Sequence, residues 1–223
     1  MPSARPHEVE ELTQEIVACL QALPKRATAD VRALRREFSK RLAHASPKMM
    51  IALALRLMDQ PGFEPRFVAY ELVAHHRAAL ARLRARELSQ LGRGLDSWYS
   101  VDTFACYLSG PAWRERQVPD SLIHRWARSK DRWWRRTALV STVPLNNRAR
   151  GGRGDTPRTL GVCAPLVDDH DDMVVKALSW ALRELAKRDP KAVRAFLAEY
   201  KDRLAARVLR EVRNKLTTGV KNP

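Results

Sequence analysis

The sequence contains few cysteines and no long apolar run, and each shortage excludes a class of protein. Its 223 residues include three cysteines, Cys19, Cys106 and Cys163, and no CxxC pair. This pattern excludes a disulfide framework and is typical of small buried thiols in a reducing compartment. Because no signal peptide and no apolar run of about 18 residues occurs, we expect a soluble, cytosolic protein without a membrane span.

Motifs for nucleotide, metal and hydrolase chemistry are missing as well. The sequence has no Walker A motif, no GxGxxG and no credibly spaced Ser/His/Asp set. His75 and His76 are adjacent, and neighbours on a helix point about 100° apart, so a partly buried or solvated pair is expected rather than a metal site. We therefore predict neither a metal nor a cofactor.

Acidic residues are outnumbered, with 25 Asp and Glu against 41 Lys and Arg and a formal net charge of +16. Such an excess indicates an anionic partner. The arginines are spread along the whole chain instead of lying in one amphipathic helix, which favours nucleic acid over an anionic membrane. A GC-rich genome that favours arginine codons is the simpler explanation for part of the excess of basic residues.

Glycine is scarce, with 9 residues, and alternating β-branched runs are rare. Apolar residues recur at helical spacing, which predicts an all-α protein. Helix after helix with short connections favours a HEAT-like solenoid of antiparallel helix pairs, in one domain over residues 1–223. A globular helical bundle stays open as the alternative. The expected helices cover roughly residues 8–23, 29–42, 47–60, 65–76, 79–90, 97–108, 120–129, 132–142, 172–188, 190–200 and 203–217.

One segment, NNRARGGRGDTPR at residues 146–158, interrupts the helical pattern. Its arginines could form a flexible cationic loop that reaches a groove or phosphates. An exposed insertion between two helices explains the same composition. Arg148, Arg150 and Arg153 are the candidate DNA-binding residues of this segment.

The stretch DSWYSVD, residues 96–102, places an acid beside an aromatic in a chain that otherwise attracts anions. If Val101, Phe104 and Leu108 form the buried stripe of a helix, Trp98 lies at its edge and Asp102 beside Trp98. The simplest role for Asp102 is a salt bridge at the surface or between helices, with Arg136 as the candidate partner.

Tryptophan occurs at two further positions among basic residues. In VVKALSWALREL, residues 174–185, Trp180 is expected on the cationic face of an amphipathic helix. It is either covered by the next helix pair or exposed as a platform for a sugar or base. In DRWWRRTALV, residues 131–140, two tryptophans neighbour three arginines, a combination suited to phosphate contact and stacking. One of Trp133 and Trp134 is expected in the core.

Three patterns together resemble the AlkD family of bacterial DNA glycosylases, which are built from HEAT-like repeats within the DNA alkylation repair superfamily. They are W-x-x-x-D at 98–102, W-x-x-R-x-A at 133–138 and K-A-x-x-W-x-L-R-E at 176–184. The resemblance covers roughly residues 62–217. It implies a monomeric, metal-free enzyme of the bacterial cytosol or nucleoid that acts in base excision repair. Such an enzyme hydrolyses the N-glycosidic bond of N3- or N7-alkylated purines in duplex DNA and leaves an abasic site.

The resemblance also implies roles for individual residues. Asp102 would be the catalytic carboxylate, Trp98 and Trp180 the aromatic walls and Arg136 the phosphate anchor. A carboxylate beside C1′ would stabilise the oxocarbenium-like sugar, and indole faces would add cation–π attraction. Further contacts to DNA are expected from Arg135, Trp133 and Lys176.

The chain departs from the family pattern at three places. Residues 23–42 lack the tyrosine expected near the lesion, Tyr99 stands where the family often has an acid, and the 146–158 segment is longer than usual. A non-catalytic HEAT-repeat protein that binds branched or damaged DNA is therefore kept as the alternative. A protein-binding helical adaptor is a third, more distant possibility.

Overall fold

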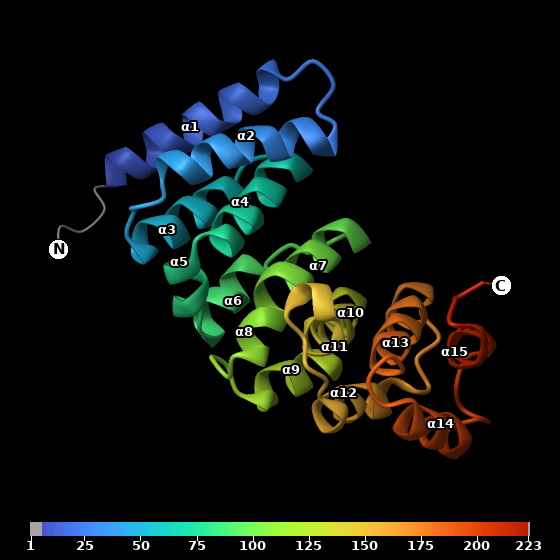
Figure 1. Ribbon diagram of the computed structural model, residues 1–223. Coiled ribbons are helices and arrows are strands. Elements are labelled where there is room, and N and C mark those ends of the chain that lie inside the picture. The colour runs from blue at the N-terminus through green and yellow to red at the C-terminus, as the bar shows by residue number, and fades with distance from the viewer. Residues whose placement is uncertain (1–5, 223) are drawn as a thin grey trace. The chain divides into compact units, whose positions relative to one another are not determined.

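The computed structural model describes residues 6–222, which form helices and turns and contain no strand. The prediction of an all-α fold is therefore confirmed. Contacts divide the chain into two compact units, residues 1–94 and 95–223, called unit 1 and unit 2 below. Within each unit, successive helices pack side by side in a repeat-like arrangement, as a helical-repeat protein requires (Figure 1).

Unit 1 is built on helix α3, which packs against α1 and α4, while α2 packs against α4. The helix expected at 47–60 begins at Pro47, where the Ser46 hydroxyl caps it by accepting a hydrogen bond from the Met49 amide at 3.2 Å. The core includes Ile16, Phe38 and Leu53. The helices are α1 (Pro6–Ala22), α2 (Thr28–Arg41), α3 (Pro47–Met58), α4 (Phe63–His75), α5 (Arg77–Arg82) and α6 (Ala85–Leu91).

The single helix expected at 79–90 is wrong, since the chain forms α5 and α6 with a break between them. Leu83 and Arg84 are extended, and Leu83 is fully buried. The Glu87 carboxylate accepts a hydrogen bond from the Arg84 amide at 3.1 Å and so begins α6. Helical periodicity on both sides of a two-residue break looks like one helix, which explains the error.

Unit 2 is organised around α10, which packs against α7, α9 and α13, while α13 packs against α15. The predicted stripe of Val101, Phe104 and Leu108 is buried. Leu178 and Leu182 form part of the buried face of α13. The elements are α7 (Trp98–Phe104), the π-helical turn η1 (Ala105–Ser109), α8 (Gly110–Arg114), α9 (Asp120–Ala127), α10 (Arg132–Ser141), α11 (Val143–Asn146), η2 (Arg148–Arg150), α12 (Thr156–Cys163), η3 (Ala164–Leu166), α13 (Asp172–Leu185), α14 (Pro190–Glu199) and α15 (Ala206–Thr218).

The start of α8, at Gly110, lies very close to the junction between α10 and α11. A Cβ placed on Gly110 would lie 2.6 Å from Pro144 Cγ and 2.8 Å from the carbonyl oxygens of Ala105 and Ser141. The Ser109 and Ser141 hydroxyls hydrogen-bond to each other at 2.7 Å across the same contact. Gly110 therefore allows the approach that holds the α7–α8 segment against α10.

Replacing Gly110 with alanine is expected to destabilise the protein by about 1–3 kcal/mol, because backbone atoms would have to move apart. Thermal unfolding measures the change as a lower Tm. Gly161→Ala is the matched control, since a Cβ there meets the His124 side chain at 3.3 Å and a helical alanine is favourable. An unchanged Tm for Gly110→Ala would show that the junction is not tightly packed.

Candidate functional site

The exposed face of α7 carries two aromatic rings in its first turn and a carboxylate one turn later. Ser97 caps the helix: its hydroxyl accepts from the Ser100 amide at 3.4 Å, and the Ser100 hydroxyl accepts from the Ser97 amide at 3.3 Å. Because Val101 and Phe104 point into the core, Trp98 and Asp102 project from another face. Residues four apart on a helix are neighbours, so the indole and the carboxylate share one surface.

The Asp102 carboxylate is held by Arg136 of α10 in a two-pronged ion pair. Arg136 Nε donates to Oδ1 at 2.9 Å and Nη2 donates to Oδ2 at 2.8 Å. Arg136 Nη1 donates to the Met173 carbonyl oxygen, in the first turn of α13, at 2.6 Å. A single guanidinium thus links α7, α10 and α13 and fixes the orientation of the carboxylate.

Burial and the ion pair act on Asp102 in opposite directions. The side chain keeps 19% of its accessible surface, against 6% for Arg136. Burial raises the pKa of Asp102 above its ordinary value, and the hydrogen bonds and charge of Arg136 partly offset that rise. The carboxylate is therefore less stabilised by its surroundings than an exposed aspartate and remains reachable from one side.

The Arg136 side chain is more deeply buried than expected for a residue that binds a DNA phosphate at the surface. It is 5% exposed, and its guanidinium donates to Asp102 and Met173. The salt bridge that the sequence offered as the simpler role for Asp102 is thus present. Contact between Arg136 and a phosphate remains a prediction, whereas its hold on Asp102 is an observed contact.

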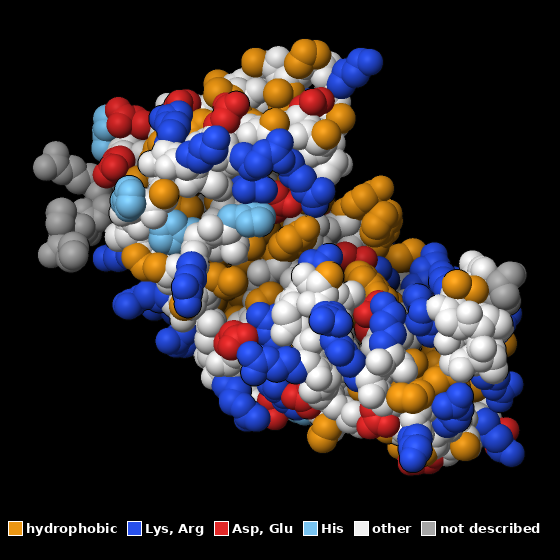
Figure 2. All heavy atoms as spheres, viewed as in Figure 1, with side chains coloured by type: hydrophobic (Ala, Val, Ile, Leu, Met, Phe, Trp, Pro, Cys, Tyr) orange, Lys and Arg blue, Asp and Glu red, His pale blue; other side chains and the backbone are white. Residues whose placement is uncertain are grey.

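Trp98 and Tyr99 form an exposed stacked pair at the start of α7. Trp98 keeps 44% and Tyr99 56% of its accessible surface. Their ring centroids lie 3.5 Å apart, and the ring planes are 26° from parallel. Figure 2 shows hydrophobic side chains gathered at this end of α7. Sequence reasoning noted Tyr99 only as a departure from a pattern and missed its contact with Trp98.

The Trp180 side chain on α13 is half-buried. It is therefore neither completely covered by neighbouring helices nor completely exposed to solvent. It follows Met173 by seven residues and therefore lies on the same helix face, about 10 Å further along. Lys176 lies between them and pairs with Asp172 at 2.6 Å near the surface. The bond from Arg136 to Met173 connects this helix to the Asp102 carboxylate.

The two tryptophans of α10 have different surroundings. Trp134 packs against Trp126 at 4.8 Å between ring centroids and meets Phe104 edge-on at 6.4 Å, so it supports the buried side of α7. Trp133 is half-buried, with the Arg132 guanidinium 4.8 Å above its ring. Trp134 is thus the residue that joins the core cluster, although both rings retain some exposure.

Arg135 is engaged within unit 2 by a partner that sequence reasoning missed. Its Nε donates to Asp169 at 2.6 Å, and Nη1 donates to the carbonyl oxygens of Ser129 and Lys130 at 3.1 and 2.8 Å. Asp169 lies in the turn before α13, where local sequence gives no sign of a contact 34 residues away. Arg135 is therefore an ordered, half-buried cation beside Arg136.

The 146–158 segment is ordered by hydrogen bonds instead of forming a wholly irregular loop. The segment includes the last residue of α11, the whole of η2 and the first residues of α12. The sequence did not predict α12. Arg188 donates to the carbonyl oxygens of Asn146 and Gly152, each at 2.8 Å. Of its candidate arginines, Arg150 lies over the Tyr107 ring at 5.1 Å, whereas Arg148 and Arg153 are exposed.

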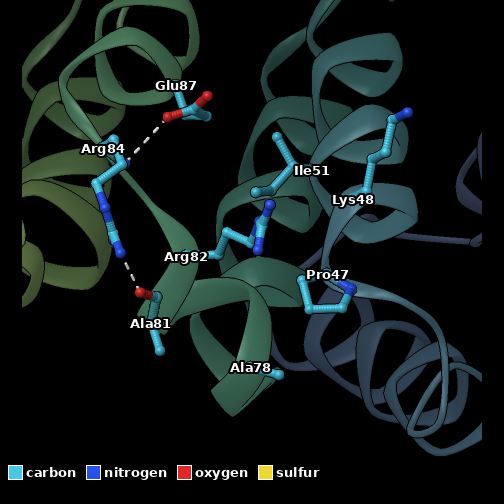
Figure 3. Close-up of a pocket in the computed structure, with 8 residues that line it drawn as sticks. All are labelled: Pro47, Lys48, Ile51, Ala78, Ala81, Arg82, Arg84 and Glu87. Atoms are coloured by element: carbon cyan, nitrogen blue, oxygen red, sulfur yellow. Dashed lines mark hydrogen bonds between the residues drawn. The ribbon is translucent and has the colours of Figure 1, made fainter.

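A separate cavity of about 780 Å³ lies in unit 1 between α3 and the α5–α6 break (Figure 3). Lys48, Arg82, Arg84 and Glu87 contribute its charged groups, and Arg84 also donates to the Ala81 carbonyl oxygen at 3.0 Å. The Glu87 carboxylate is used to begin α6. This cavity lacks the aromatic ring beside a carboxylate that marks the α7 site.

Residues 6–222 show neither a metal-binding cluster nor a membrane-spanning helix. These residues contain no group of three or more His, Cys, Asp or Glu side chains placed to hold a metal ion. None of the helices formed by them is long and apolar enough to cross a membrane. Lys and Arg side chains are spread over the visible face of unit 2, in keeping with the net charge of +16 (Figure 2).

Comparison with known proteins gives one finding on the family of the chain. A family model described as DNA alkylation repair enzyme matches residues 26–216. The match includes Trp98, Asp102, Arg136 and Trp180. No curated protein matches the chain.

Proposed function

The chain belongs to the DNA alkylation repair enzyme family, and from this premise we propose that it is a monofunctional DNA glycosylase for cationic alkylpurines. Its substrate is an N3- or N7-alkylated purine nucleotide in duplex DNA. The observation that carries the proposal is the Asp102 carboxylate, fixed by Arg136 and still partly exposed, four residues along α7 from the exposed ring of Trp98.

The proposed reaction needs little help at the leaving group. Alkylation at N3 or N7 makes the base cationic, so the electron pair of the N-glycosidic bond leaves with the base and neutralises it. The deoxyribose becomes oxocarbenium-like, and the ionised Asp102 stabilises that charge. Water then attacks C1′ and loses a proton to the carboxylate or to solvent, which leaves an abasic site.

The neighbouring side chains divide the remaining tasks. Trp98 and Trp180 offer π faces to the developing positive charge. Arg136 orients Asp102 and favours its ionised form, in addition to the phosphate contact expected from the family pattern. Arg135, Lys176, Arg148, Arg150 and Arg153 supply contacts to the DNA backbone, which is the usual role of basic residues at such interfaces. The indole of Trp133 adds a stacking contact to the DNA.

The direct test is release of free base from a duplex that carries 7-methylguanine or 3-methyladenine. We expect the protein to release the methylated base and to leave an alkali-labile strand, with no release from the undamaged duplex. Binding to undamaged duplex is expected to weaken steeply as salt rises, because phosphate contacts displace counterions. Tight, salt-dependent binding without any base release would contradict the enzymatic proposal.

A non-catalytic DNA-binding protein is the second candidate, and the ion pair itself favours it. Both oxygens of Asp102 are satisfied by Arg136, as they would be in a purely structural contact between α7 and α10. This candidate predicts binding to branched or undamaged duplex, no base release and no specific effect of changing Asp102 beyond stability. An affinity insensitive to salt would instead favour a protein-binding adaptor.

A further inference from the structure

We infer that Tyr99 is a positioning residue of the α7 site, which holds the Trp98 indole by stacking and so fixes the π face presented beside Asp102. This inference rests on the proposed glycosylase function and adds a residue to it.

The helical positions place both rings over the same carboxylate. Asp102 follows Tyr99 by three residues and Trp98 by four, and both spacings make neighbours on a helix surface. Helical side chains lean toward the N-terminus, so the Asp102 carboxylate is directed back toward the turn that carries the two rings. From this helical spacing we place Trp98 and Tyr99 on either side of the Asp102 carboxylate.

The geometry of the pair restricts how a ligand can meet the indole. At 3.5 Å between centroids, with planes 26° from parallel, the Tyr99 ring covers one face of Trp98. A substrate can use only the other face, and this constraint removes alternative approaches. Without Tyr99, an exposed tryptophan in the first turn of a helix would sample several rotamers.

Exposure argues that the pair serves a ligand and not the core. Trp98 and Tyr99 keep 44% and 56% of their accessible surface, whereas Val101, Phe104 and Leu108 of the same segment are fully buried. Paired aromatic rings left in solvent are typical of interaction sites. The ligand that suits two π faces beside a carboxylate is a cationic one, here the sugar as it loses its base.

The test compares Tyr99→Ala, Tyr99→Phe and wild type in single-turnover release of 7-methylguanine at saturating protein. We expect Tyr99→Ala to release the base about 2- to 12-fold more slowly, the loss that removal of an aromatic pair implies. Tyr99→Phe keeps the stack and should match wild type. Unchanged duplex affinity and Tm in both variants would exclude a general effect on binding or folding.

Phe63→Ala is the control for loss of an exposed, paired aromatic ring, since Phe63 in unit 1 is 37% exposed and packs against Phe67. It should leave release unchanged. Equal rates for Tyr99→Ala and wild type would overturn the inference. Equal slowing by Tyr99→Phe and Tyr99→Ala would also overturn it, because the hydroxyl and not the stack would then matter.

A binding measurement separates this inference from the proposed function. The probe is a duplex with a pyrrolidine in place of one deoxyribose, because its cationic ring resembles the sugar in the transition state. Wild type should bind it more tightly than the undamaged duplex, and Tyr99→Ala should lose part of that preference. Absence of base release by wild type refutes the glycosylase proposal, whereas an equal preference in both proteins refutes the role of Tyr99.

Discussion

Replacing Asp102 with asparagine is expected to slow release of 7-methylguanine by at least about 100-fold, the loss typical when one charge-stabilising group is removed from an active site. Asparagine has nearly the same shape and keeps an acceptor for Arg136, but it carries no charge to oppose the oxocarbenium-like sugar. Affinity for undamaged duplex should not fall, because Asp102 repels phosphate. Single-turnover release and equilibrium binding on the same preparation measure both quantities.

The matched control is Asp169→Asn. Asp169 pairs with Arg135, the neighbour of Arg136 on α10, and keeps 12% of its side-chain surface, close to the 19% of Asp102. This variant breaks a comparable ion pair without touching the α7 carboxylate, so its release rate should stay near that of wild type. Equal rates for Asp102→Asn and wild type would remove Asp102 from the mechanism.

A pH series on wild type gives a second measurement of the same role. Only the ionised carboxylate stabilises a cation, so release should decline as the pH falls through the pKa of Asp102. Burial raises that pKa, and the decline should therefore begin at a higher pH than for an ordinary aspartate. A rate that does not change over this range would argue that Asp102 carries no catalytic charge.

Replacing Arg136 with methionine is expected to destabilise the protein by about 3 kcal/mol at neutral pH, because it leaves Asp102 partly buried and ionised without its partner. Loss of the bonds to Asp102 and Met173 also removes the link between α7, α10 and α13. Urea unfolding of variant and wild type measures the difference. The same variant should release alkylated base more slowly, since the carboxylate loses its fixed orientation.

The pH dependence of this loss identifies its cause. In the folded variant the pKa of Asp102 should lie even further above its unfolded value, so ionisation opposes folding above that pKa. The deficit should therefore shrink as the pH falls and Asp102 takes up a proton. The double variant Asp102→Leu with Arg136→Met removes the buried charge and should recover part of the stability. A single variant as stable as wild type would contradict this account.

The sequence predicted most of the helices and the buried stripe of α7 because both depend on local spacing. The buried stripe of α7 follows from three apolar residues at helical intervals, and it determines on which face Asp102 projects. The start of α10 at Arg132 agrees with the helix expected at 132–142, and the Asp131 carboxylate caps it by accepting from the Trp133 amide at 2.8 Å. These features need no knowledge of distant contacts.

Apart from the ion pair of Asp102 with Arg136, the features that depend on distant contacts were not predicted. The 146–158 segment is ordered by Arg188, which lies 36 and 42 residues from its two acceptors, and composition alone could not show this. The Asp169 partner of Arg135 was missed for the same reason. Stacking of Tyr99 on Trp98 depends on side-chain rotamers, which helical periodicity does not specify.

The π-helical turn at Ala105–Ser109 determines the direction in which the α7 residues face. A π turn accommodates one extra residue within an otherwise continuous helix. With one residue fewer, the segment could wind as a regular α-helix, and everything before the turn would rotate by about 100° relative to α8. The carboxylate would then point away from the guanidinium on α10. A single-residue difference in helix register therefore determines the direction in which the Asp102 side chain points. The close contact of Gly110 with the α10–α11 junction fixes the position of the helix after this turn.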